Sequence, residues 1–167
     1  MSSSSCLSDI GIRRHLLPGD IGAVVRLHGK LYYEEFGFGL GFERYVAETF
    51  SDFVKHFKPG LDQVWLAEQG GELVGFISLV HRSPDQAQLR YFVVDPSVRG
   101  LGLGNLLFFS CLEHGRRAGY RAVYLWTSDK LTQAASMYRK AGFELVLEES
   151  SDSFGVLLRE QKYELIL

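Results

Sequence analysis

Three glycines within residues 99–104 constrain the fold of this chain more than any other feature. The segment reads Arg-Gly-Leu-Gly-Leu-Gly and separates a strand-like run at residues 88–94 from a helical run at residues 104–118. Glycine lets a bulky ligand approach main-chain N–H groups without meeting a Cβ atom. The start of a helix adds unpaired N–H donors and the positive end of the helix dipole. The pattern predicts a strand–loop–helix unit that binds a phosphate or pyrophosphate, with Arg99 adding charge-assisted hydrogen bonds.

Two common phosphate-binding motifs do not fit this segment. A Walker loop needs a second glycine five positions after the first, and Asn105 stands there when the count starts at Gly100. The dinucleotide fingerprint Gly-x-Gly-x-x-Gly fails too, because its last glycine would be Asn105 or Leu107. A plain tight turn is the structural alternative, but three glycines at a helix start would be an entropically costly way to build one.

Hydrophobic periodicity divides the rest of the chain into strands and helices. Asp20 is expected to cap the first helix, and Gly70-Gly71 to form a tight hairpin turn. Strands are expected at residues 12–17, 63–68, 72–81, 88–94, 122–127, 143–147 and 155–166. Helices are expected from residue 21 to a break at 37–41, and at 42–57, 104–118 and 131–141.

The resulting order is β-α-α-β-β-β-α-β-α-β-β. It predicts an α+β (mixed α/β) fold with a central mixed, mostly antiparallel sheet of about six or seven strands and helices on both faces. A chain of 167 residues fits one domain. We expect a disordered tail at residues 1–10 and a single domain at residues 11–167.

The pattern Arg-x-x-Gly-x-Gly, formed by Arg99, Gly102 and Gly104, resembles the acetyl-CoA pyrophosphate loop of the GNAT superfamily of N-acetyltransferases. Residues 87–96 resemble the strand that precedes this loop in the family. Residues 134–143 are similar to its Ala-x-x-x-Tyr-x-x-x-Gly-Phe signature. Residues 32–37 and the following helix are similar to the acetyltransferase half of fused MarR-type regulators, although no winged-helix segment is present.

The resemblance implies that acetyl-CoA lies between two splayed parallel strands, at residues 88–94 and 122–127. Its pantetheine arm would pair with the main chain of Phe92, Val93 and Val94, and its pyrophosphate would lie on the N–H groups that follow Arg99. The implied pyrophosphate-binding residues are Arg99, Gly100, Leu101, Gly102, Leu103 and Gly104. Family members often carry an asparagine after the second strand; Thr127 or Thr132 is the candidate to replace it here.

Tyr138 is the candidate general acid, because a phenol near the sulfur can protonate the departing thiolate. The alternative is a core aromatic residue on the same helical stripe as its neighbours. Glu34 and Glu35, expected in the loop between the first two helices, are the leading candidates for the general base, and a role there would favour a cationic acceptor. His81 and Tyr91 are weaker candidates for the same role, and Trp126 is a candidate wall of the acceptor pocket.

Composition adds mainly exclusions. The formal net charge of −2 gives no general attraction to nucleic acid, and no apolar run is long enough for a membrane span. The two cysteines indicate a cytoplasmic setting, and no metal-binding spacing appears. The expected function is transfer of an acetyl group from acetyl-CoA to a small amine. The alternative function is a non-catalytic acyl-CoA sensor. A homodimer is a possible assembly. The identity of the amine stays open.

Overall fold

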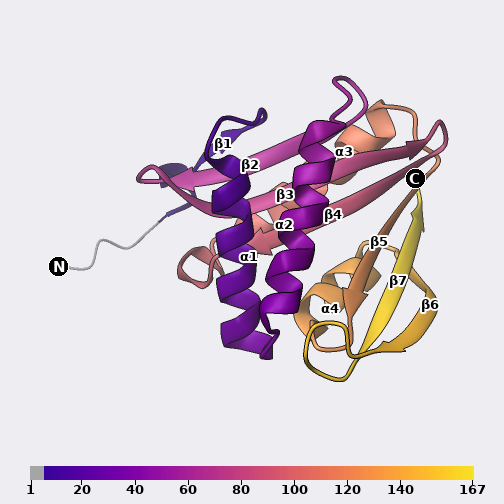
Figure 1. Ribbon diagram of the computed structural model, residues 1–167. Coiled ribbons are helices and arrows are strands. Elements are labelled where there is room, and N and C mark those ends of the chain that lie inside the picture. The colour runs from indigo at the N-terminus through magenta and orange to yellow at the C-terminus, as the bar shows by residue number, and fades with distance from the viewer. Residues whose placement is uncertain (1–5) are drawn as a thin grey trace.

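The computed structural model describes residues 6–167 and contains one seven-stranded sheet with four α-helices (Figure 1). The strands are β1 (Gly11–Arg13), β2 (Gln63–Gln69), β3 (Glu72–Ser83), β4 (Gln86–Val94), β5 (Ala122–Ser128), β6 (Glu144–Ser151) and β7 (Leu158–Ile166). The helices are α1 (Asp20–Phe36), α2 (Leu40–Lys55), α3 (Leu103–Arg117) and α4 (Thr132–Lys140). Two 3-10 turns complete the set, at Leu7–Asp9 and Pro96–Val98.

The sheet has the strand order β1-β2-β3-β4-β5-β7-β6. Only β4 and β5 pair in parallel, and every other neighbouring pair is antiparallel. Figure 1 shows α1 and α2 side by side in front of the sheet and α3 behind it. The predicted mixed, mostly antiparallel sheet with helices on both faces is therefore confirmed.

Two hydrophobic cores, one on each face, hold the layers together. On the α1–α2 face, the aromatic stripe of α2 packs Phe50 and Phe53 against the sheet, where Phe50 contacts Phe76 and Tyr91 edge-on. Burial of each such side chain contributes about 1.5–3 kcal/mol. The same face carries most of the aromatic residues near the site described below.

The turn between β2 and β3 has the predicted geometry. Gly70 and Gly71 both have positive φ, 59° and 84°, as a type I′ hairpin requires. The last hairpin differs from prediction in its bounds, because β6 runs to Ser151 and β7 begins at Leu158. Strand β6 lies at the sheet edge and is exposed along nearly its whole length.

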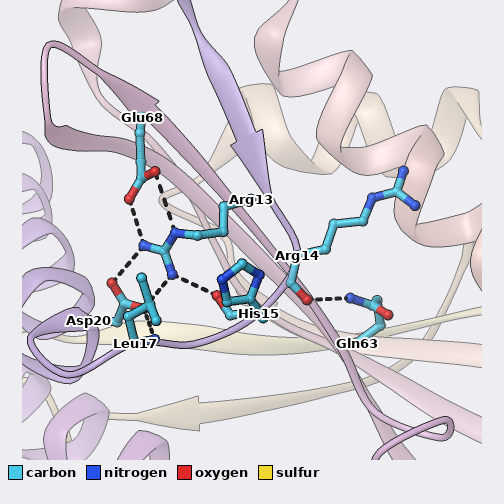
Figure 2. Close-up of polar contacts among 7 residues, drawn as sticks. All are labelled: Arg13, Arg14, His15, Leu17, Asp20, Gln63 and Glu68. Carbon is cyan, nitrogen blue, oxygen red and sulfur yellow. Dashed lines mark hydrogen bonds and ion pairs between the residues drawn. The ribbon is translucent and has the colours of Figure 1, made fainter.

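The N-terminal segment departs from prediction in two ways. Strand β1 ends at Arg13 rather than continuing to residue 17. Asp20 does not cap α1: Gly19 occupies the N-cap, and the Asp20 carboxylate instead accepts from the Arg13 guanidinium and from the N–H of Leu17 (Figure 2). Burial alone would raise the pKa of Asp20, but these hydrogen bonds outweigh it and hold that pKa below its usual value.

Arg13 explains the short strand. Its guanidinium also pairs with Glu68 on β2 and donates to the main-chain oxygen of His15, so the chain bends there to reach α1 (Figure 2). One cation thus ties the first strand, its sheet neighbour and the first helix together.

The ordered fold begins before the predicted boundary at residue 11. Residues 1–5 of the predicted tail lie outside the described residues. Leu7–Asp9 form a 3-10 turn, and Ile10 is buried in the core, so part of the expected tail is structured. None of the helices within residues 6–167 is both long and apolar enough to cross a membrane.

Candidate active site

The parallel strands β4 and β5 separate after a short paired stretch. They are in register at Gln86–Ala122, Ala87–Val123 and Gln88–Tyr124. Beyond Gln88, β4 continues to pair with β3, and β5 continues to pair with β7. The two strands therefore enclose a V-shaped opening, as the splayed-strand prediction requires.

A β-bulge on β4 accompanies the separation. Tyr91 and Phe92 together face Ile77 of β3, where the register shifts. Tyr91 has a φ of 55° and is the one non-glycine residue within residues 6–167 with positive φ. A left-handed tyrosine is strained, and bulges of this kind redirect side chains next to functional sites. The strain lies where the strand edge becomes open.

The start of α3 has the geometry that the sequence predicts for an anion site. Gly102 is its N-cap in the left-handed conformation, with a φ of 89°, and no side chain caps the helix. The first N–H groups of the helix therefore have no partner within it. A Cβ atom added to Gly100 or Gly102 would meet no protein atom within 4 Å, so these positions face open space. The loop is shaped to admit a bulky anion.

A groove of about 730 Å³ extends from this loop to α4. Seven of the predicted cofactor-binding residues line this groove: Phe92, Val93, Val94, Arg99, Gly100, Gly102 and Gly104. Two others from the same loop, Leu101 and Leu103, do not line it. Leu103 is instead buried in the core, with 1% of its surface exposed. Sequence reasoning missed three polar residues that line the groove, Asn105, Lys130 and Gln133. Thr132, predicted to replace the family's asparagine, lines the groove as well.

Arg99 reaches the groove in a fixed position. Its Nε donates to the main-chain oxygen of Val94, and its Nη1 lies 2.7 Å from Oε1 of Glu35. Glu34 and Glu35 lie in the last turn of α1 and not in the predicted loop, because that helix continues to Phe36 before Gly37 ends it with a φ of 72°. Glu35 lines the groove, whereas Glu34 is exposed and lines neither of the two cavities described here.

Tyr138 lies on α4 at the boundary between this groove and a second cavity. Its ring is buried beside Phe108, Phe143 and Tyr163. Burial, with a smaller contribution from nearby Tyr32, raises the pKa of the Tyr138 phenol well above its usual value. The phenol is therefore protonated at neutral pH and available as a proton donor.

The second cavity has a volume of about 150 Å³ and lies between α1, α2 and the open edge of β4. It shares Tyr32, Phe92, Leu131 and Tyr138 with the groove, so the two spaces meet at these four residues. Trp126 and Tyr91, both considered from the sequence, line it. His81 lines neither space; its Nδ1 is 2.9 Å from the Tyr120 hydroxyl.

Three buried polar atoms of the cavity's lining residues have no hydrogen-bond partner within residues 6–167. They are Nε2 of His28, Oη of Tyr91 and Oγ1 of Thr127. Buried polar atoms are almost always satisfied, and exceptions concentrate at functional sites. The signal in the sequence was weak, because His28 falls on the apolar stripe of α1 and is indistinguishable there from a core residue.

His28 makes stability depend on pH. Burial lowers its pKa to about 4, although the hydrogen bond between its Nδ1 and the main-chain oxygen of Val24 opposes the shift. The unfolded chain, with an ordinary histidine pKa of about 6.5, binds more protons between these values. His28 therefore contributes stability that is fully present above pH 6.5 and is lost as pH falls toward 4, by about 3 kcal/mol.

Urea unfolding at pH 7 and pH 4.5 measures this effect. The wild type should lose about 2–3 kcal/mol more than His28→Gln does over that interval. The exposed His56 gives the matched control, and His56→Gln should follow the wild type. Equal losses in the wild type and His28→Gln would contradict the assignment.

No three histidine, cysteine, aspartate or glutamate side chains within the described part of the chain come together in an arrangement that could hold a metal ion. The site combines an uncapped helix start, an open strand edge and a buried phenol at the junction of two cavities.

Comparison with known proteins agrees with this geometry. Residues 28–143 match the model of the acetyltransferase (GNAT) family. An uncharacterised N-acetyltransferase of Schizosaccharomyces pombe is 29% identical over 139 residues, which cover 82% of this chain and 84% of that protein. The chain spans 27%, 50% and 39% of the length of three further curated relatives.

Solved structures show the same fold. An acetyltransferase from Streptococcus agalactiae superposes with a TM-score of 0.76 at 19% identity, covering 96% of this chain and all of that one. A GNAT family acetyltransferase from Elizabethkingia anophelis, solved with acetyl-CoA bound, gives a TM-score of 0.63 at 14% identity and covers 95% of this chain and 99% of that one.

Proposed function

The chain belongs to the acetyltransferase (GNAT) family, and on that premise we propose that it transfers the acetyl group of acetyl-CoA to a primary amine by direct attack in a ternary complex. One observation carries the proposal. The uncapped start of α3 and the open edge of β4 line one groove, and that groove meets a second cavity at Tyr138. The groove fits the donor, and the cavity fits the acceptor.

The groove suits acetyl-CoA along its length. The N–H groups from Gly100 to Gly104 and the Arg99 guanidinium would hold the pyrophosphate. The main chain of Phe92, Val93 and Val94 would pair with the pantetheine amides, because this stretch of β4 lacks a strand partner on the β5 side. Thr132, Lys130 and Gln133 offer polar contacts at the opposite wall.

The reaction needs two proton transfers. The lone pair of a neutral amine attacks the thioester carbonyl, a C–N bond forms and the C–S bond breaks. The leaving thiolate takes a proton, for which Tyr138 is positioned at the junction of donor and acceptor spaces. The attacking nitrogen gives up one proton, which balances the proton taken by the thiolate, so a neutral amine yields amide and thiol with no net release of protons.

The sequence offers Glu34 and Glu35 as groups to accept the amine proton, but Glu35 is ion-paired with Arg99 and Glu34 lines neither cavity, so a role in cofactor binding is expected for Glu35 instead. We expect Glu35→Gln to leave kcat and its pH profile unchanged within about twofold, and to act on acetyl-CoA binding through Arg99. Glu34→Gln, one residue away on the exposed side, is the matched control and should change neither. Loss of the low-pH limb of kcat in Glu35→Gln would instead identify it as the base.

Release of free thiol from acetyl-CoA in the presence of a panel of primary amines tests the function. Steady-state turnover with at least one amine is expected, with an enzyme-only blank because Cys6 is exposed and reacts with thiol reagents. Calorimetric binding of acetyl-CoA without turnover across the panel would support the alternative, a non-catalytic acyl-CoA sensor.

Three further expectations stay predictions. These are the cytoplasmic setting, the likeness of the N-terminal half to fused MarR-type regulators, and a possible homodimer. Light scattering at several protein concentrations would test the last, and the exposed edge strand β6 gives it a surface to examine first.

A further inference from the structure

The acceptor cavity is lined by two charged side chains of opposite sign. Arg90 projects from β4 and Glu160 from β7. Burial lowers the pKa of His28 to about 4 and raises that of Tyr32, Tyr91 and Tyr138, so these four lining groups are neutral at pH 7. The fixed charge of the cavity is therefore one cation and one anion.

Arg90 is held in place without a carboxylate partner. Its Nη2 donates to the hydroxyl of Tyr45, at 2.9 Å, and its Cζ lies 4.6 Å from the centre of the Tyr91 ring. Stacking on one ring and a hydrogen bond to another fix the plane of the guanidinium. Only one of its five N–H donors is used among residues 6–167, so the group can still bind a carboxylate with two parallel hydrogen bonds.

Two other arginines of the molecule are held by carboxylates, whereas Arg90 is not. Arg13 is paired with Asp20 and Glu68, and Arg99 is paired with Glu35. Arg90 takes part in no ion pair within the described chain, although it is half-buried. A half-buried, oriented and unpaired guanidinium at a ligand cavity is a site for an anion.

Glu160 supplies the opposite charge. It faces Ser128 across the β5–β7 pairing and is also half-buried. It is the one carboxylate among the lining residues of the cavity, and within residues 6–167 it has neither an ion pair nor a side-chain hydrogen bond. A protonated amine entering the cavity would find its counter-charge there.

The remaining walls limit size and polarity. Half of the lining residues are tyrosine, phenylalanine or tryptophan, with Phe38, Phe42 and Phe154 packed against one another. The volume of about 150 Å³ is below the range of about 300–1,000 Å³ typical of drug-sized ligands. The cavity therefore fits a molecule of amino-acid size with an apolar body.

We propose that the acetyl acceptor is a small zwitterion, an amino acid with an apolar or aromatic side chain, whose carboxylate binds Arg90 and whose ammonium group is drawn to Glu160. The proposal rests on the acetyltransferase function and adds its substrate class. Arg90 is a specificity residue in this account, because it binds a part of the acceptor that does not react.

Matched acceptors test the proposal. Phenylalanine and leucine are compared with phenethylamine and isoamylamine, which lack only the carboxylate, by thiol release from saturating acetyl-CoA. The expected kcat/KM for each amino acid exceeds that of its amine at least about 30-fold, mainly through KM, because a site built around a polar group rejects analogues that lack it. Equal or better turnover of the amines would overturn the proposal.

Single substitutions test whether Arg90 causes the preference for amino acids over amines. In Arg90→Gln the KM for the amino acids should rise at least about 30-fold, while the kinetics of the amines stay within about twofold. Arg44→Gln removes the same charge from α2 next to Tyr45, outside the cavity, and should match the wild type. If Arg90→Gln does not fold, Tyr45→Phe removes only the anchoring hydroxyl and should raise the same KM several-fold.

The two levels of failure can be told apart. Turnover of carboxylate-free amines alone, or an equal loss of both acceptor types in Arg90→Gln, would overturn the acceptor class and leave the acetyltransferase function intact. Absence of thiol release with every amine, despite acetyl-CoA binding, would overturn the function itself.

Discussion

Tyr138→Phe is expected to lower kcat for acetyl transfer by about 100-fold, at the lower end of the effects of general acids, while the KM for acetyl-CoA changes little. The ring is buried among Phe108, Phe143 and Tyr163, so phenylalanine keeps the packing and removes only the hydroxyl. The phenol is protonated at neutral pH because burial raises its pKa, and it lies where both cavities meet. The thiolate would then leave without its proton donor.

Tyr163→Phe is the matched control, since it removes the hydroxyl of an adjacent buried tyrosine that lines neither cavity. That hydroxyl accepts from Arg139, so the control is expected to lose some stability but no kcat. Pre-steady-state measurement of thiol release establishes whether the chemical step limits turnover. An unchanged kcat in Tyr138→Phe with chemistry limiting would remove the residue from the mechanism and leave it as a core aromatic.

Gly102→Val is expected to raise the KM for acetyl-CoA by about 100-fold or more. A branched side chain at this N-cap would project into the space that faces the helix N–H groups, because no protein atom lies within 4 Å of the added Cβ. Hydrogen bonds from these donors to a charged pyrophosphate contribute about 1.5–3 kcal/mol each, and several would be lost or lengthened. Calorimetric titration with acetyl-CoA measures the loss directly.

The same substitution also forces valine into the left-handed conformation, which costs about 1–2 kcal/mol of stability. Gly119→Val separates the two effects. Gly119 follows the other end of α3, has a φ of 85°, and has equally open surroundings, but it lies outside both cavities. Both variants should lose similar stability, and only Gly102→Val should lose affinity. Normal acetyl-CoA binding by folded Gly102→Val would refute the anion-site interpretation of the loop.

The parts predictable from sequence were those determined by neighbours along the chain. The Gly70-Gly71 turn, the aromatic stripe of α2 and the glycine loop before α3 each depend on local spacing, and the structure has them all. The misplacement of Glu34 and Glu35 has a local cause as well. Helix α1 continues through both residues and ends only where Gly37 adopts positive φ.

The acceptor cavity could not be predicted in the same way. Arg90 and Glu160 come from strands far apart in sequence, and only the pairing of β5 with β7 brings Glu160 to the cavity that Arg90 lines. Asp20 failed as a helix cap for a similar reason. Its carboxylate accepts two hydrogen bonds from the Arg13 guanidinium instead of capping the helix. Rules for helix capping consider only the residues at the start of the helix and do not predict this contact.

The separation of β4 from β5 divides the sheet into two parts. One consists of β1 to β4 and the other of β5, β7 and β6, and their backbones pair at three register positions. Beyond Gln88 the main chain of β4 therefore has no strand partner on the β5 side. A donor molecule lying along this open edge would shield the main-chain N–H groups of β4 from solvent. Hydrogen exchange should then slow in residues 89–94 when acetyl-CoA binds, while the β2–β3 hairpin, already paired on both sides of its turn, keeps its rate.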